Sequence, residues 1–98
     1  MKVLITGASS GMGRDMAKYL SSFDYKLILV SKDKKNLDKI FKDDKNVIAT
    51  YGYNLIKEED CIELYNKVKD ENIDILINNA GFGDAGKFTE TSLDKEMD

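Results

Sequence analysis

The sequence has no histidine and only one cysteine, Cys61, among its 98 residues. Without an imidazole there is no base for a serine or cysteine triad, and no carboxylates or cysteines are grouped with the spacing of metal ligands. A single cysteine cannot form a disulfide within the chain. We therefore expect no triad, no metal site and no internal disulfide.

The sequence also has no basic tract and no long apolar run. Its 15 Lys and Arg residues and 18 Asp and Glu residues are scattered and give a net charge of -3, so we expect no nucleic-acid partner. No apolar run approaches the roughly 18 residues of a membrane-spanning helix, so we expect no membrane partner. Met1 leads almost directly into an apolar run without a charged leader, which predicts a cytoplasmic protein.

The sequence alternates short apolar runs with helical patterns. The apolar runs at 3–5, 27–30, 47–49 and 73–77 predict four strands that are buried on both faces. Helical spacing is found between them in three sets of residues: Met12, Met16 and Leu20; Leu37, Ile40 and Phe41; Cys61, Leu64, Tyr65 and Val68. This alternation predicts one α/β domain over 1–98, a doubly wound parallel sheet with strand order 3-2-1-4 and helices on its faces.

A glycine-rich turn, TGASSGMG, joins the first apolar run to the first helical pattern. At such a turn the backbone N–H groups and the positive end of the helix can face a phosphate or pyrophosphate. We expect Gly7 to adopt a positive φ, Gly11 to leave room for the ligand, and Gly13 to let the helix pack closely on the strand. The alternative is a tight turn that binds nothing.

The glycine spacing separates two kinds of phosphate loop. No lysine follows Gly13, although a nucleoside-triphosphate loop needs one, and the spacing G-x-G-x-x-G is not matched either. The segment instead resembles the cofactor motif T-G-x-x-x-G-x-G of the short-chain dehydrogenase/reductases. The resemblance implies a dinucleotide bound by the three glycines together with Ser9, Ser10 and Met12.

A second motif, NNAG at 78–81, follows the fourth apolar run directly. In the same family this segment borders the cofactor, which implies that Asn79, Ala80 and Gly81 lie beside it. Without the resemblance to the family, the same residues predict only a turn at the end of a strand. The resemblance covers all 98 residues and implies a partial, Rossmann-like NAD(P)-binding domain.

The letters VSKD after the second apolar run bear on the choice of cofactor. Lys32 matches the basic residue that meets the additional phosphate of NADP(H), so NADP(H) is favoured over NAD(H). Asp33 leaves NAD(H) open, because its carboxylate could accept hydrogen bonds from a ribose, and it could equally cap the next helix. Lys32 could also be an ordinary surface lysine.

Asn54 and Leu55 stand where the family often has an aspartate and an aliphatic residue at the adenine. The departure from aspartate leaves an acceptor in place, because an asparagine carbonyl can accept a hydrogen bond from the adenine amino group. An ordinary turn asparagine is the alternative reading of Asn54.

The family's catalytic serine and Tyr-x-x-x-Lys pair would all fall after Asp98, so we expect no catalytic residue in this chain. The stretches 53–57 and 65–69 spell the same pattern, but neither has the expected place in the fold. The resemblance thus predicts the cofactor-binding portion of an oxidoreductase that moves hydride between NAD(P)(H) and a carbonyl or alcohol. That substrate would bind only if a C-terminal half is present.

Two other functions stay open: a non-catalytic module that binds or senses a dinucleotide, and an interaction scaffold without ligand. The order of the strands also leaves the fourth at an edge of the sheet, where its isoleucines would meet water. We therefore predict a homo-oligomer that associates through this edge or the helices beside it, or a chain of marginal stability.

Overall fold

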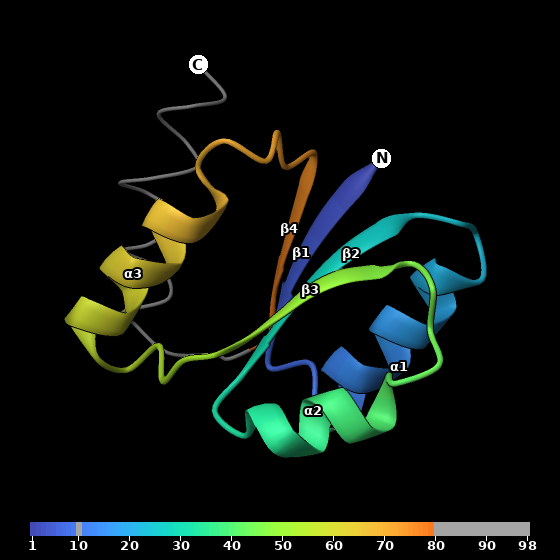
Figure 1. Cartoon of the computed structure of the whole chain (residues 1–98), viewed down its shortest axis with the longest axis horizontal. Helices are drawn as coiled ribbons and strands as arrows, with labels where there is room; N and C mark the ends of the chain where they lie inside the picture. Colours follow the sequence, from blue (N-terminus) through green and yellow to red (C-terminus); the bar gives the residue numbers. More distant parts are fainter. Residues whose placement is uncertain (10, 80–98) are drawn as a thin grey trace.

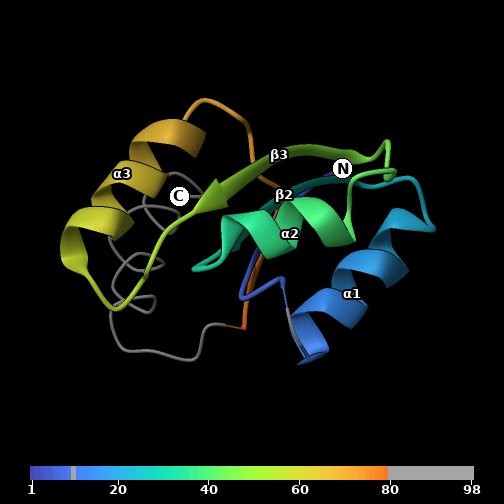
Figure 2. The same cartoon turned by 60° about the horizontal axis from the view of Figure 1, so that its bottom comes forward.

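The computed structural model describes residues 1–9 and 11–79. Its elements, in chain order, are β1 (Lys2–Thr6), α1 (Gly11–Ser21), β2 (Lys26–Ser31), α2 (Lys34–Ile40), β3 (Val47–Gly52), α3 (Glu58–Val68) and β4 (Ile75–Asn78). The strands pair in parallel in the order β3-β2-β1-β4. Helices α1 and α2 lie on one side of the sheet and α3 on the other (Figures 1 and 2). The predicted doubly wound fold is confirmed.

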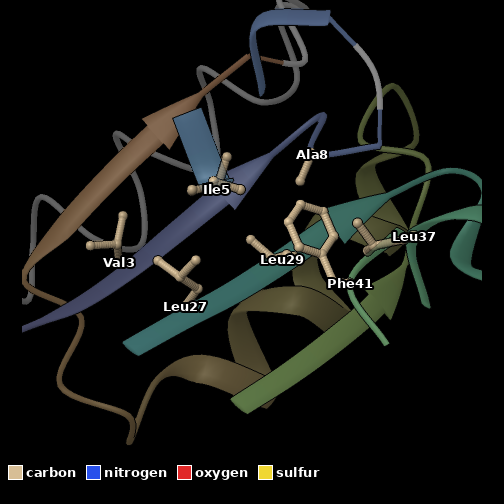
Figure 3. Close-up of a cluster of buried hydrophobic side chains, with 8 residues drawn as sticks. Val3, Ile5, Ala8, Leu27, Leu29, Leu37 and Phe41 are labelled. Carbon is tan, nitrogen blue, oxygen red and sulfur yellow. The ribbon is translucent and has the colours of Figure 1, made fainter. Parts of the chain in front are cut away.

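Side chains alternate along the central strands and build a core on each face of the sheet. Towards α1 and α2 the core consists of Val3, Ile5, Ala8, Ala17, Leu27, Leu29, Leu37 and Phe41, most of which are labelled in Figure 3. Towards α3 it consists of Leu4, Ile28, Val30, Leu55, Cys61, Leu64 and Val68. Because β1 and β2 are covered on both faces, their apolar runs have no polar interruption.

The helical stripe predicted for α1 is correct for Leu20, which packs against the core, and wrong for Met12. Met12 is 71% exposed and Met16 is only half-buried, whereas Gly13 and Ala17 are the buried residues of the helix. At Gly13 the reason is the close approach of α1 to the glycine turn, which leaves no room for a side chain. The other two stripes are confirmed, with Leu37 buried in α2 and with Cys61, Leu64 and Val68 buried in α3.

The prediction of four strands buried on both faces is correct for β1 and β2 and wrong for the outer pair. In β3 a register shift places Val47 opposite Leu27 and Ala49 opposite Ile28, so Ile48 is an extra residue and is 45% exposed. Such a bulge moves the following side chains to the other face of the sheet. In β4 the first residue, Ile75, is 37% exposed. Both strands are edges of the sheet in the described part of the chain.

The sheet order creates the place for a site. The chain moves from β1 outward to β3 and then returns to the other side of β1 to form β4. Parallel α/β sheets bind ligands beyond the carboxyl ends of their strands at such a reversal. The glycine turn leaves β1 at this point.

Candidate functional site

A cavity of about 450 Å³ opens at the carboxyl ends of the strands. Its size is within the range of small-molecule and cofactor sites. The residues around it come from the glycine turn, the end of β2, the segment after β3 and the end of β4: Gly7, Ser9, Met12, Gly13, Val30, Ser31, Lys32, Asp33, Tyr53, Asn54, Leu55 and Asn79.

The three glycines of the turn are required for different reasons. Gly7 has φ 65°, as predicted, and Gly11 has φ 56°. A Cβ at Gly13 would lie 2.1 Å from the carbonyl oxygen of Gly7, so α1 begins in direct contact with the turn. A Cβ at Gly11 would meet nothing within 4 Å. Glycine is therefore favoured at this position by the left-handed backbone and not by a lack of space.

Ser31 fixes the turn to the end of β2. Its hydroxyl is 2.5 Å from the hydroxyl of Ser9 and accepts a hydrogen bond from the backbone N–H of Asp33 at 3.1 Å. The backbone N–H of Ala8 adds a bond of 3.1 Å to the carbonyl of Val30. The sequence analysis missed Ser31, and its place directly before Lys32 was the only signal. It is 6% exposed and lines the cavity.

Lys32 and Asp33 follow at the rim of the cavity and differ in what holds them. One carboxylate oxygen of Asp33 accepts the backbone N–H of Asn36 at 3.0 Å, so Asp33 is the N-cap of α2. This is the capping role that the sequence left open. Lys32 lines the same cavity with an exposed side chain.

Asn54 forms a turn before α3. Its side-chain carbonyl accepts the N–H of Ile56 at 3.2 Å, and its own N–H donates to Asp60 at 2.7 Å. A carbonyl oxygen has two lone pairs, so this turn bond leaves acceptor capacity on the side chain. Leu55 is 4% exposed and packs in the core under α3.

The ends of β1 and β4 are joined beneath the cavity. The Thr6 hydroxyl donates to the side-chain carbonyl of Asn78 at 2.9 Å and accepts the backbone N–H of Asn79 at 3.1 Å. These bonds place the Asn79 side chain at the cavity, where its Nδ2 is buried and has no hydrogen-bond partner. A buried donor without a partner costs about 1–3 kcal/mol, so this position favours a ligand that brings an acceptor.

Tyr53 is a cavity residue that the sequence analysis did not place in the site. Burial, and after it the nearby Glu63 carboxylate, raises the pKa of the Tyr53 phenol. A tyrosine that exchanges a proton beside a lysine has its pKa lowered instead. Tyr65, the other tyrosine of a Tyr-x-x-x-Lys stretch, packs on the core under α3.

The structure therefore brings together eight of the twelve residues predicted for cofactor binding, namely Gly7, Ser9, Met12, Gly13, Lys32, Asn54, Leu55 and Asn79. Gly11 lies in the turn but does not line the cavity. Ser10, Ala80 and Gly81 lie outside the described residues.

Residues 1–9 and 11–79 hold no group of three His, Cys, Asp or Glu side chains suited to a metal ion. The helices in this part of the chain are too short or too polar to cross a membrane.

Comparison with known proteins gives a consistent family. A model of the short chain dehydrogenase family matches residues 1–98. An uncharacterized oxidoreductase of Staphylococcus saprophyticus is 33% identical over 97 residues, which cover 93% of this chain and 42% of that protein. The chain spans less than half the length of the curated relatives it matches.

Solved structures agree on the fold. The bulky-bulky ketone specific alcohol dehydrogenase of Comamonas testosteroni has a TM-score of 0.73 and 33% identity, covering 84% of this chain and 35% of its own. A short-chain dehydrogenase of Sphingobium yanoikuyae in complex with NADPH has a TM-score of 0.70 and 33% identity, covering 83% of this chain and 34% of its own.

Proposed function

The chain belongs to the short-chain dehydrogenase family, and we propose that it binds a nicotinamide dinucleotide, with NADP(H) preferred over NAD(H). It corresponds to the N-terminal portion of an oxidoreductase of this family. The observation that carries the proposal is the cavity at the carboxyl ends of the strands, where the glycine turn, Lys32 and Asn79 meet.

The residues of the cavity fit a dinucleotide in two respects. Gly7 and Gly13 line the cavity without side chains where the 11-residue helix α1 begins, and the first backbone N–H groups of a helix can bind a pyrophosphate. The buried Nδ2 of Asn79 is a donor without a partner, and a ribose or phosphate oxygen would satisfy it. Ser9, in the same cavity, has a hydroxyl that can turn from Ser31 to a ligand.

The preference for NADP(H) is supported by the different uses of Lys32 and Asp33. An NAD(H) site at the end of the second strand uses an acid to accept hydrogen bonds from the ribose. Here one oxygen of the only acid at that position, Asp33, is already bonded to the backbone of α2. Lys32 lies beside it with a positive charge suited to the additional phosphate. The solved relative from Sphingobium yanoikuyae holds NADPH.

The proposed reaction of the full-length protein is reversible hydride transfer between NADP(H) and a carbonyl or alcohol. When bound, the nicotinamide supplies or accepts the hydride, and the residues of this chain bind and orient the dinucleotide. We propose that the carbonyl or alcohol is bound by polypeptide beyond these residues. A cytoplasmic location and a homo-oligomeric state stay predictions.

Calorimetric titration of the 98-residue chain with NADPH and NADH tests the proposal. We expect saturable binding with NADPH the tighter ligand. The variant Lys32→Glu should weaken NADPH binding by about tenfold or more, since it replaces an attraction to phosphate with a repulsion. NADH binding, which involves no phosphate at this position, should change much less.

The matched control is Lys35→Glu, which makes the same charge change at an exposed lysine of α2 outside the cavity lining. It should leave both affinities within about twofold, because screened surface charges interact weakly. A folded chain that binds neither dinucleotide would refute the proposed function. Equal losses of NADPH affinity in both variants would refute the role of Lys32.

A further inference from the structure

We propose that Tyr53 stacks on the adenine ring of the dinucleotide, an inference that rests on the proposed function of the cavity. Tyr53 is the first residue after β3 and lines the cavity. The chain leaves the sheet at this point and crosses to α3 (Figure 1). Because β2 lies between β3 and β1, Tyr53 is separated from the glycine turn, which follows β1.

The lining of the cavity differs in chemistry between its β1 side and its β3 side. On the β1 side, Gly7 and Ser9 precede the start of α1, which suits a phosphate. On the β3 side, the lining includes the Tyr53 ring and the apolar residues Val30 and Leu55, which are 1% and 4% exposed. An aromatic ring among apolar side chains suits the face of a planar base and not a phosphate. A base of the dinucleotide therefore lies on the β3 side.

The position of Lys32 distinguishes between the two bases of the dinucleotide. The backbone N–H of Tyr53 donates to the carbonyl of Ser31 at 3.0 Å, so Tyr53 lies beside the residue that precedes Lys32. Lys32 lines the same cavity, and its proposed ligand is the additional phosphate of NADP(H). That phosphate is carried by the ribose of the adenosine half. The base nearest to it is therefore adenine and not nicotinamide.

The Tyr53 ring is held in place by its neighbours within the chain. It stacks with the Tyr51 ring, with centroids 6.0 Å apart and planes 24° apart. Both rings pack against the core under α3. Burial, and after it the Glu63 carboxylate that hydrogen-bonds to the phenol, raises the pKa of Tyr53, so the phenol stays protonated at neutral pH. A ring that is ordered in advance loses few torsions when a base stacks on it, which favours binding.

Calorimetric titration with two ligands tests the proposal. One ligand is NADPH, and the other is the adenosine bisphosphate that forms one half of NADPH without the nicotinamide. Tyr53→Leu removes the ring and should weaken the binding of both ligands by the same factor of about tenfold, the order of a stacking contact with one base. Tyr53→Phe keeps the ring and should bind both ligands within about twofold of the native chain. The matched control Tyr19→Leu changes a tyrosine of α1 outside the cavity lining and should leave both affinities unchanged.

Tyrosine fluorescence keeps the test valid if Tyr53→Leu does not fold. The chain has five tyrosines and no tryptophan, so its intrinsic emission comes from tyrosine. Adenine stacked on Tyr53 should quench the emission of that residue. Titration with the adenosine bisphosphate should therefore quench the fluorescence of the native chain and quench that of Tyr53→Phe much less.

Four results would overturn the stacking on Tyr53 while the native chain still binds NADPH. If Tyr53→Leu left the NADPH affinity unchanged, the ring would make no contact with the ligand. If only NADPH were weakened and not the adenosine bisphosphate, the ring would contact the nicotinamide half. If Tyr53→Phe bound as weakly as Tyr53→Leu, the hydroxyl and not the ring face would be responsible. Equal quenching in the native chain and in Tyr53→Phe would place the adenine at another residue.

A folded native chain that binds neither ligand would give a different result from these four. It would refute the proposed function of the cavity, and the stacking on Tyr53 together with it.

Discussion

Gly13 is the residue on which the shape of the site most depends. An added Cβ would lie 2.1 Å from the carbonyl oxygen of Gly7 and 2.9 Å from its carbonyl carbon, and both are backbone atoms that cannot rotate away. We predict that Gly13→Ala forces α1 from the turn and lowers the free energy of unfolding by about 3 kcal/mol, at the upper end for overpacked sites. Urea denaturation followed by circular dichroism measures the change.

Gly11→Ala is the comparison for this prediction. Gly11 has φ 56° but open space around its missing Cβ, so the variant has backbone strain without a clash. We expect a loss of about 1 kcal/mol. A loss for Gly13→Ala no larger than that for Gly11→Ala would show that the contact with Gly7 relaxes easily, and would contradict the prediction.

At the scale of elements, the short helix α2 is fastened to β3 through Asp38. Its carboxylate accepts hydrogen bonds from Lys34 at 2.7 Å and from the Thr50 hydroxyl at 2.5 Å. The hydrogen bond from Lys34, followed by that from Thr50, lowers the pKa of Asp38 below its usual 3.8. A lowered folded-state pKa stabilises the fold above the unfolded-state value, and this contribution is lost as pH falls through the folded-state value.

We therefore predict that Asp38→Asn lowers stability at pH 7 and reduces the further loss of stability between about pH 4 and pH 2. Urea midpoints measured across this range for the native chain and the variant check both effects. Asp43→Asn, at an exposed aspartate after α2, provides the control. If Asp38→Asn and Asp43→Asn show the same dependence of stability on pH, the hydrogen bonds of Asp38 do not contribute to the stability of the fold.

The elements also show how far the sequence determines the fold. Uninterrupted apolar runs located β1 and β2 correctly, because a strand that is buried on both faces has apolar side chains at successive positions. The run 47–49 could not reveal the bulge at Ile48, since a bulge depends on the register with β2 and not on residue type. Hydrophobic spacing missed Gly13 and Ala17, the buried residues of α1, and at Gly13 the cause is contact with the glycine turn, which leaves no room for a side chain.

The site was predictable where backbone requirements dictate residue type. The glycine turn and Asn79 belong to motifs whose residue types suit one particular backbone geometry. The structure brings them to one cavity. Ser31 and Tyr53 were missed because serine and tyrosine at the end of a strand fit many surroundings. Their place in the site follows from the alignment of β2 and β3 in the sheet, where the Tyr53 N–H donates to the Ser31 carbonyl at 3.0 Å.

At the scale of the whole molecule, the proposed dinucleotide binding can be tested separately from catalysis. The chain has the cavity that supports dinucleotide binding, but it spans less than half the length of its curated relatives. Among the described residues, the tyrosine that reaches the cavity is Tyr53, and its pKa is raised by burial and by Glu63. A phenol with a raised pKa is a poor partner for proton transfer at neutral pH.

We accordingly predict that the 98-residue chain binds NADPH without turnover. Absorbance of NADPH at saturating concentration, followed with a panel of ketones and aldehydes, should show no decrease above the rate without protein. Steady-state reduction by the chain would contradict this prediction, and Tyr53→Phe would then decide whether Tyr53 is responsible. If that activity survived Tyr53→Phe, the proton would have to come from another residue or from water. Binding without turnover would instead locate the chemistry in polypeptide beyond these residues, with the nucleotide held as proposed.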